Sequence, residues 1–286
     1  MKAAVLGKPI GHSLSPVLHL AAYQALGLTD WTYDLVECDE AGLADYVRSR
    51  GPAWAGLSLT MPLKRTVLPL LDHLDQLAAA TGGANTVVFR PEGRYGYNTD
   101  VQGIVDALTE AGCAGPDSAG PASAGPGGVT ILGGGATACS ALAAVGELGL
   151  LGADVVLRDP SRADDLLATA GRLGLQVRLR PWEDLEGDAI RPDLLISTAP
   201  AGAADAYAQR VRGTRQAPAA LLDVVYHPWP TPLAQAAMAA GSAVASGHAM
   251  LLHQAAAQVE LMTGKPAPLE AMREAAERDL ARRKLS

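Results

Sequence analysis

The chain has few cysteines and no long apolar run. Its three cysteines, Cys38, Cys113 and Cys139, are widely spaced and form no Cys-x-x-Cys pair, so neither a disulfide framework nor a zinc knuckle is predicted. No run of about eighteen apolar residues occurs, and the stretch between Lys2 and Lys8 is too short for a signal-peptide core. We therefore expect a cytoplasmic protein without a membrane partner.

Positive charge is also scarce. The 286 residues include 23 Lys and Arg against 30 Asp and Glu, which gives a net charge of -7. Nucleic acids and anionic membranes need a basic face, so we expect neither as a partner and favour a small molecule. The six histidines form no paired motif such as His-Glu-x-x-His, and we predict no metal site.

Short aliphatic or β-branched runs alternate with longer helical stretches, which predicts an α/β fold with mainly parallel strands. Strands are predicted at residues 2–6, 32–37, 54–60, 86–89, 129–132 and 154–157. Residues 113–128 are dominated by Gly, Ala, Pro and Ser. Such a composition buries too little apolar surface to order itself, so it predicts a flexible loop near a domain junction.

A dinucleotide-binding fingerprint follows the strand predicted at 129–132, and an alanine-rich helical stretch comes after it. The sequence there reads Gly133, Gly134, Gly135, Ala136, Thr137 and Ala138. The first glycine permits a tight turn, Gly135 lets a pyrophosphate approach the backbone, and Ala138 stands where helix and strand pack closely. The free N–H groups at the start of the helix favour phosphate. These features predict a Rossmann-like doubly wound domain.

Arg158 and Asp159 follow the strand at 154–157, where ribose recognition is expected. An arginine pairs with the 2'-phosphate of NADP, whereas an aspartate repels that phosphate and accepts hydrogen bonds from the free 2'-OH of NAD. Arg162 adds a second cation or is an exposed helix residue. Taken alone, these side chains leave the cofactor open.

Lys64 ends a stretch, residues 51–63, that contains no charged residue. Desolvation in such a place destabilises the ammonium group and eases proton loss, which suits a chemical role. Asp100, in the polar segment 98–100, offers a carboxylate partner. Further toward the N-terminus, Ser15 and Pro16 predict the N-cap and first residue of a helix. Ser13 and Ser15 then either bind a carboxylate at that helix start or, for Ser15, only cap it.

Several segments, in order along nearly the whole chain, resemble the motifs of the shikimate dehydrogenase family. They are residues 7–16, 56–64, 83–87, 98–100, the fingerprint at Gly133, 223–228 and 247–255. The most specific are His12-Ser13-Leu14-Ser15-Pro16 and the phrase that ends in Lys64. The resemblance implies reversible NADPH-dependent reduction of 3-dehydroshikimate to shikimate, on the pathway to chorismate and the aromatic amino acids. The alternatives are an NAD-using quinate/shikimate or aminoshikimate-type dehydrogenase and a non-catalytic dinucleotide-binding sensor.

The resemblance also implies roles for individual residues, with Lys64 and Asp100 as the catalytic pair. Substrate contacts would come from Ser13, Ser15, Thr60, Lys64, Asn85, Asp100, Tyr226 and Gln254. Beside the fingerprint, cofactor contacts would come from Arg158, Asp159, Arg162, Thr198, Ala199, Val224, Gly247 and Met250. NADP-preferring members commonly carry Asn-Arg-Thr where this chain has Leu157-Arg158-Asp159, so only the arginine matches. We favour NADP, with NAD as the alternative.

We expect residues 1–103 to form an N-terminal α/β substrate domain and residues 104–246 to form the dinucleotide-binding domain. Residues 247–286 would return to the first domain as helices. A monomer and a homodimer are equally compatible with the sequence.

Overall fold

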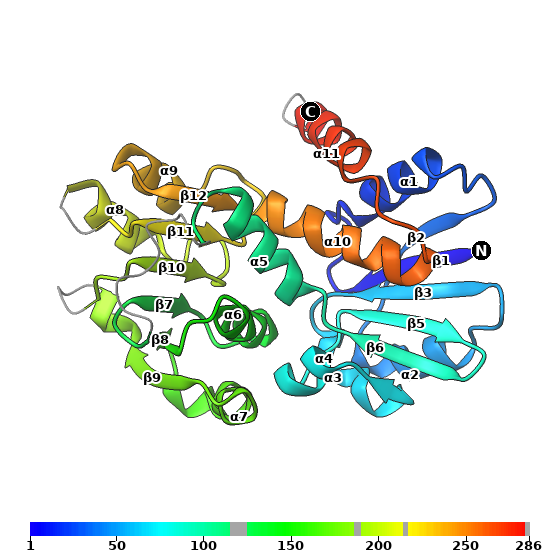
Figure 1. The fold of residues 1–286 in the computed structure, drawn as a ribbon, viewed down its shortest axis with the longest axis horizontal. Helices are drawn as coiled ribbons and strands as arrows, with labels where there is room; N and C mark the ends of the chain where they lie inside the picture. The colour runs from blue at the N-terminus through cyan, green and yellow to red at the C-terminus, as the bar shows by residue number, and fades with distance from the viewer. Residues whose placement is uncertain (115–124, 186–189, 214–216, 284–286) are drawn as a thin grey trace. The chain divides into compact units, whose positions relative to one another are not determined.

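The computed structural model describes residues 1–114, 125–185, 190–213 and 217–283. The chain divides into two compact units: unit 1 comprises Met1–Thr99 and Leu252–Ser286, and unit 2 comprises Asp100–Leu251. Each unit has its own six-stranded sheet, and the predicted α/β class is confirmed (Figure 1). Most of the flexible loop predicted at 113–128 lies outside the described residues.

The sheet of unit 1 has the strand order β2-β1-β3-β5-β6-β4. Its strands are β1 (Lys2–Gly7), β2 (Thr32–Glu37), β3 (Trp54–Leu59), β4 (His73–Leu74), β5 (Thr86–Arg90) and β6 (Gly93–Tyr97). The first three strands are parallel, but β5 is antiparallel to both β3 and β6. The sequence did not predict β6, because its Gly-Arg-Tyr-Gly-Tyr run lacks a β-branched residue.

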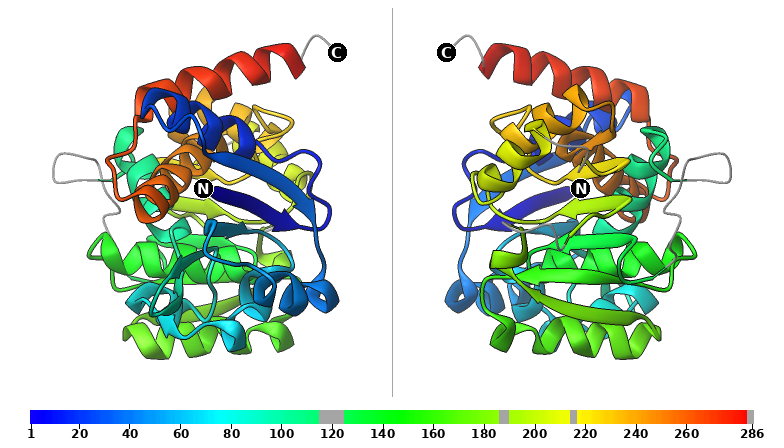
Figure 2. Two further views of the ribbon diagram at one scale, coloured as in Figure 1. Left: turned by 90° about the vertical axis from the view of Figure 1, so that its right-hand side faces the viewer. Right: turned by 90° about the vertical axis from the view of Figure 1, so that its left-hand side faces the viewer.

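Within the described residues, six helices belong wholly or partly to unit 1. They are α1 (Ser15–Ala25), α2 (Glu40–Arg48), α3 (Leu63–Thr66), α4 (Gln76–Thr81), α10 (Gly247–Thr263) and α11 (Leu269–Arg283), with the 3-10 turn η1 (Leu68–Leu70). α11 packs against α1, as the views in Figure 2 show. Arg283 Nη1 donates to the carbonyl of His12 at 3.1 Å. The C-terminal helices thus return to the first unit, which confirms that prediction.

All six strands of unit 2 are parallel, in the order β12-β11-β10-β7-β8-β9. They are β7 (Val129–Leu132), β8 (Gly152–Leu157), β9 (Gln176–Pro181), β10 (Leu194–Ser197), β11 (Ala220–Asp223) and β12 (Ala243–Ser246). The chain runs outward from β7 to β9 and then crosses back to β10. This is the strand order of the dinucleotide-binding fold, in which ligands bind where the order reverses, at the carboxyl ends of the two central strands. The Rossmann-like prediction is confirmed.

Helices surround this sheet because its strands are apolar on both faces. They are α5 (Asp100–Glu110), α6 (Ala136–Glu147), α7 (Asp164–Leu173), α8 (Asp205–Gly213) and α9 (Pro232–Ala239), with the turns η2 (Pro160–Arg162) and η3 (Trp182–Leu185). Every residue of β7, β8, β10 and β11 is buried, as expected of a parallel sheet covered on both sides. Four of the eight buried residues of α6 are alanines, and such small side chains let the helix pack closely.

No helix among the described residues is both long and apolar enough to cross a lipid bilayer.

An ion pair between a buried carboxylate and a half-exposed arginine joins two strands of unit 2 and yields a test of the fold. The carboxylate of Asp154 on β8 accepts hydrogen bonds from Arg178 Nε and Nη2, both at 2.6 Å. The Asp154 side chain is only 4% exposed. Arg178→Met leaves this carboxylate buried without its cation, and should lower the free energy of unfolding by about 1–3 kcal/mol.

Urea unfolding measures this change. Arg212→Met, which removes an exposed arginine of α8 in the same unit, serves as the control and should change stability by less than about 0.5 kcal/mol. Equal stability of the Arg178→Met and Arg212→Met variants would contradict the assignment.

Candidate active site

The two serines predicted to bind a carboxylate lie at the start of α1. Ser15 was predicted as the N-cap, but this was wrong: the helix already begins at Ser15, and the N-cap residue is Leu14, which has no side-chain acceptor. Ser13 supplies the acceptor instead, because its Oγ accepts the backbone N–H of Ser15 at 3.2 Å. The Ser15 side chain is buried.

Lys64 lies in the short helix α3, directly after β3. Thr60 ends the strand region, and its carbonyl accepts from Leu63 N at 2.8 Å, which turns the chain into the helix. The carbonyl of Lys64 accepts from Ala84 N at 2.8 Å. Lys64 is therefore held, through its own backbone, against the segment that leads into Asn85, and its side chain is half-buried.

The side-chain amide of Asn85 has one fixed orientation. Its Oδ1 accepts from the backbone N–H of Thr99 at 2.9 Å and from Thr86 Oγ1 at 2.8 Å. Because a backbone N–H only donates, Oδ1 is the oxygen and Nδ2 is the donor. Nδ2 donates to Thr99 Oγ1 at 2.9 Å and to Gln254 Oε1 at 3.4 Å. Two predicted substrate residues, Asn85 and Gln254, are thus in contact although 169 positions separate them.

Three further predicted residues lie at element ends in unit 2. Asp100 is the first residue of α5 and is 4% exposed. Tyr226 follows β11, is half-buried, and has its ring centroid 6.0 Å from that of His248. Gly247 begins α10, and a Cβ there would lie 2.4 Å from the carbonyl oxygen of Val224. Only glycine permits this close approach of the two chain segments.

The fingerprint lies between β7 and α6, at the centre of the parallel sheet. Gly133 has φ +109°, and a Cβ there would meet Thr198 Oγ1 at 2.6 Å. Thr198 Oγ1 in turn donates to the carbonyl of Leu132 at 2.7 Å, which ties the end of β10 to the turn. Gly135 is the N-cap of α6 and has open space within 4 Å of where its Cβ would lie.

These features fit a bound dinucleotide. The space at Gly135 lets a phosphate reach the backbone, and the twelve-residue helix α6 offers its first N–H groups. Ala138 is fully buried, as close packing of helix on strand requires. The remaining predicted contacts also lie after strand ends: Gly134 in the turn, Ala136 and Thr137 in the first turn of α6, Ala199 after β10, and Met250 in α10.

In the segment after β8, where ribose recognition is predicted, Arg158 and Asp159 make different contacts. The guanidinium carbon of Arg158 lies 5.3 Å from the ring centroid of Trp182, over its face. Asp159 Oδ1 accepts from Ser161 N at 3.0 Å and from Ser161 Oγ at 2.6 Å, as the N-cap of η2. Asp159 is thus engaged in a local cap, while Arg158 rests on an aromatic surface. The side chain of Arg162 lies outside the described residues.

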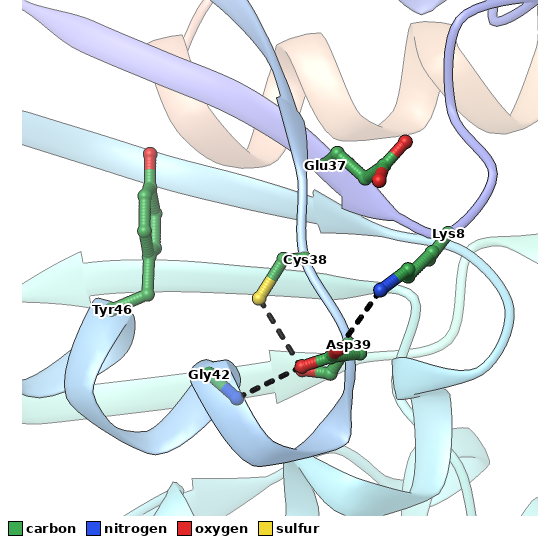
Figure 3. Close-up of a pocket in the computed structure, with 6 residues that line it drawn as sticks. All are labelled: Lys8, Glu37, Cys38, Asp39, Gly42 and Tyr46. Atoms are coloured by element: carbon green, nitrogen blue, oxygen red, sulfur yellow. Dashed lines mark hydrogen bonds and ion pairs between the residues drawn. The ribbon is translucent and has the colours of Figure 1, made fainter.

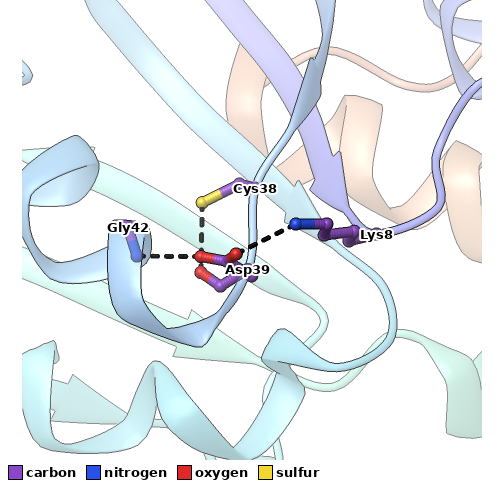
Figure 4. A network of polar contacts seen from close by, with 4 residues as sticks. All are labelled: Lys8, Cys38, Asp39 and Gly42. Atoms are coloured by element: carbon purple, nitrogen blue, oxygen red, sulfur yellow. Dashed lines mark hydrogen bonds and ion pairs between the residues drawn. The ribbon is translucent and has the colours of Figure 1, made fainter.

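A different part of unit 1 contains an open pocket of about 280 Å³ (Figure 3). Its lining residues are Lys8, Glu37, Cys38, Asp39, Gly42 and Tyr46. Asp39 accepts from Lys8 Nζ at 3.1 Å and from Gly42 N at 3.2 Å, and its carbonyl accepts from Cys38 Sγ at 3.4 Å (Figure 4). Burial raises the pKa of the Cys38 thiol. None of the predicted site residues lines this pocket, and its two carboxylates disfavour an acidic substrate.

Among the described residues, no group of three or more His, Cys, Asp or Glu side chains is arranged to hold a metal ion.

The fold defines an α/β protein with one Rossmann-like unit, which contains the predicted dinucleotide turn, and a second unit that holds most of the residues predicted to bind a small molecule. The chain matches the model of the shikimate dehydrogenase substrate binding domain over residues 5–87, and that of the shikimate 5'-dehydrogenase C-terminal domain over residues 247–277. A curated relative, shikimate dehydrogenase (NADP(+)) from Methanococcoides burtonii, is 34% identical over 94% of this chain and 95% of its own length. The chain belongs to the shikimate dehydrogenase family.

Solved structures agree. Shikimate dehydrogenase from Mycobacterium tuberculosis is 43% identical with a TM-score of 0.84, over 96% of this chain and 98% of that one. Shikimate 5-dehydrogenase from Thermus thermophilus, in complex with NADP(H) and shikimate, is 31% identical with a TM-score of 0.77, over 97% of this chain and 99% of that one.

Sequence reasoning missed the buried side chains that support Asn85. Gln258 Nε2 donates to the carbonyl of Asn85 at 3.3 Å and to Thr86 Oγ1 at 2.9 Å. Its Oε1 accepts from Ser58 Oγ at 2.8 Å and lies 3.2 Å from His19 Nε2. One signal was available, since Gln258 lies one helical turn after Gln254 and shares its face.

His19, at the edge of this group, gives a pH-dependent prediction. Burial lowers the pKa of its imidazole to about 3, against an ordinary value of 6.5. Between these two pH values the unfolded chain binds a proton that the folded protein does not. Stability should therefore fall as pH drops below about 6.5, by up to about 1.4 kcal/mol per pH unit, and should not depend on His19 above that pH.

Urea unfolding of the wild type and of His19→Phe at pH 7.5 and 4.5 checks this. The variant lacks the titrating ring, so at pH 4.5 its stability relative to the wild type should improve by about 2–3 kcal/mol. Parallel pH dependences of the two proteins would contradict a neutral buried His19.

Proposed function

We propose that this chain catalyses the reversible NADP-dependent interconversion of 3-dehydroshikimate and shikimate. The observation that carries the proposal is the contact of Asn85 with Gln254. It lies beside Ala84, whose N–H binds the carbonyl of Lys64. The same protein has a glycine turn at Gly133 whose geometry fits a bound dinucleotide. The curated relatives named shikimate dehydrogenase (NADP(+)) support it.

The substrate suits these groups chemically. Shikimate is a small ring with one carboxylate and several hydroxyls, so its site needs few charges and many hydrogen-bonding groups. In the proposal, Ser13 and Ser15 bind the carboxylate at the N-terminus of the eleven-residue helix α1, where the helix dipole favours negative charge. Asn85 and Gln254 bind ring hydroxyls.

A hydroxyl is the group that the Asn85 and Gln254 pair selects. Asn85 Nδ2 is a donor and Gln254 Oε1 an acceptor, so a hydroxyl between them accepts one hydrogen bond and donates the other. A carbonyl at that position only accepts, so it can bind Asn85 Nδ2 but has no proton to donate to Gln254 Oε1. Thr60 and Tyr226 complete the proposed set of substrate contacts.

Lys64 carries the proton in the proposed reaction. NADP, when bound, supplies or accepts the hydride at C3 of the ring. During reduction, negative charge develops on the former carbonyl oxygen, and the Lys64 ammonium donates a hydrogen bond and then its proton to that oxygen. Asp100 orients the ammonium and a substrate hydroxyl. In the oxidation direction the same lysine, then neutral, accepts the hydroxyl proton.

Lys64→Ala tests this role. Loss of the proton donor should lower kcat by about a hundred-fold or more, while KM for shikimate changes by only a few-fold, because Lys64 acts mainly on the transition state. Initial rates of cofactor reduction measure both constants. Arg65→Ala removes the neighbouring cation of α3 as the matched control. A Lys64→Ala enzyme with wild-type kcat would refute the assignment.

Two observations favour NADP over NAD. Trp182 holds the guanidinium of Arg158 on its ring face, where it can pair with a 2'-phosphate. The carboxylate of Asp159 already accepts two hydrogen bonds from Ser161, which makes it a poorer acceptor for the 2'-OH of NAD. This arrangement supports NADP although the negatively charged Asp159 directly follows Arg158 in the sequence.

Arg158→Met tests cofactor choice. Without the guanidinium, KM for NADP should rise by about ten-fold or more, since a charge-assisted phosphate contact is lost. KM for NAD should stay within about two-fold, because NAD has no 2'-phosphate. Arg172→Met, on α7, is the control for loss of a cation. If the wild type prefers NAD, or if both cofactors weaken equally in Arg158→Met, Arg158 does not read the phosphate.

A further inference from the structure

A chain of buried hydrogen bonds runs through unit 1 behind the proposed substrate residues. Its side chains are Tyr33, Ser58, Gln258, Thr86, Asn85 and Gln254, all of them less than one-tenth exposed. They come from β2, β3, α10, the start of β5 and the residue before it. Segments distant in the sequence are thus joined by polar contacts rather than by apolar packing alone.

Every link of the chain donates in the same direction. Tyr33 Oη donates to Ser58 Oγ at 2.7 Å, and Ser58 Oγ donates to Gln258 Oε1 at 2.8 Å. Gln258 Nε2 then donates to the carbonyl of Asn85 at 3.3 Å. A carbonyl oxygen only accepts, so the Gln258 amide cannot be turned over without breaking this contact.

The remaining hydrogen bonds of this series fix the orientation of the Asn85 amide. Thr86 Oγ1 accepts from Gln258 Nε2 at 2.9 Å and therefore donates its own proton to Asn85 Oδ1, at 2.8 Å. Asn85 Nδ2 is left to donate toward Gln254. Because the groups are desolvated, reversing any one link would leave a buried donor or acceptor unpaired.

We propose that Gln258 is a positioning residue that holds Asn85 in the geometry needed to bind a ring hydroxyl. It donates directly to the backbone carbonyl of Asn85, and it is linked to the Asn85 side-chain oxygen through the hydroxyl of Thr86. The inference rests on the proposed function, which assigns Asn85 and Gln254 to the substrate. Gln258 touches neither substrate nor cofactor in this scheme, so it governs substrate affinity and leaves the hydride and proton steps to other groups.

The two ends of the Gln258 amide make separable predictions. The donor side, Nε2 with Thr86, faces Asn85, whereas the acceptor side, Oε1, receives Ser58 and His19. Gln258→Met and Thr86→Val each remove the donor-side link with little change in volume. Tyr33→Phe and His19→Phe remove equally buried groups on the acceptor side and leave the donor side intact, which makes them matched controls.

The experiment measures steady-state kinetics with shikimate and NADP, and urea unfolding, for the full-length wild type and these four variants. Gln258→Met and Thr86→Val should raise KM for shikimate by about ten-fold, with kcat and KM for NADP within about three-fold of the wild type. Tyr33→Phe and His19→Phe should leave KM for shikimate within about two-fold, whatever they do to stability.

The inference is overturned if the donor-side variants keep the wild-type KM, or if all four variants raise KM alike, as a purely structural network would. If Gln258→Met does not fold, Thr86→Val decides the matter. Failure of the proposed function is a distinct outcome, because the wild type itself would then not oxidise shikimate.

Discussion

The orientation of one buried amide, that of Asn85, organises the substrate half of this protein. The backbone N–H of Thr99 fixes its oxygen, and Gln258 reaches its backbone carbonyl from α10. The same residue lies directly after Ala84, whose N–H holds the carbonyl of Lys64. The segment thus couples the helix that returns to unit 1, the end of β6 and the short helix of the proposed catalytic lysine. A site that distinguishes hydroxyls needs this fixed polarity, because a rotated amide would offer an acceptor where a donor is required.

The cofactor half depends on a different constraint, the close approach of backbone segments at the carboxyl ends of parallel strands. Gly133 lies against Thr198, and Gly247 lies against the carbonyl of Val224. At each glycine, a Cβ would collide with that neighbour. Such contacts leave the loops little freedom and keep α6 aimed at the expected phosphate position. In the proposed function, cofactor specificity is then added chiefly by Arg158, which lies on the ring face of Trp182.

Much of the fold could be predicted from the sequence because its signals are local. The strand at 129–132, the glycines and the alanine-rich helix form one continuous motif, and the parallel order of the sheet follows from the β-α alternation. What could not be predicted depends on contacts between distant segments. The sequence does not predict that Trp182 lies beneath Arg158, because this contact depends on the pairing of β8 with β9. Nor does it predict that Gln258 supports Asn85. The start of α1 was misplaced by one residue because Ser15-Pro16 satisfies the N-cap pattern, while Ser13 in fact accepts the N–H.

The proposed function requires a pair of side chains that binds a hydroxyl, a positioned lysine and an arginine suited to a 2'-phosphate. The measurement that tests it most directly is the initial rate of cofactor reduction by the wild-type protein with shikimate or quinate, each with NADP or NAD. The highest kcat/KM is expected for shikimate with NADP. Absence of turnover with shikimate, or a higher kcat/KM for quinate or with NAD, would contradict it.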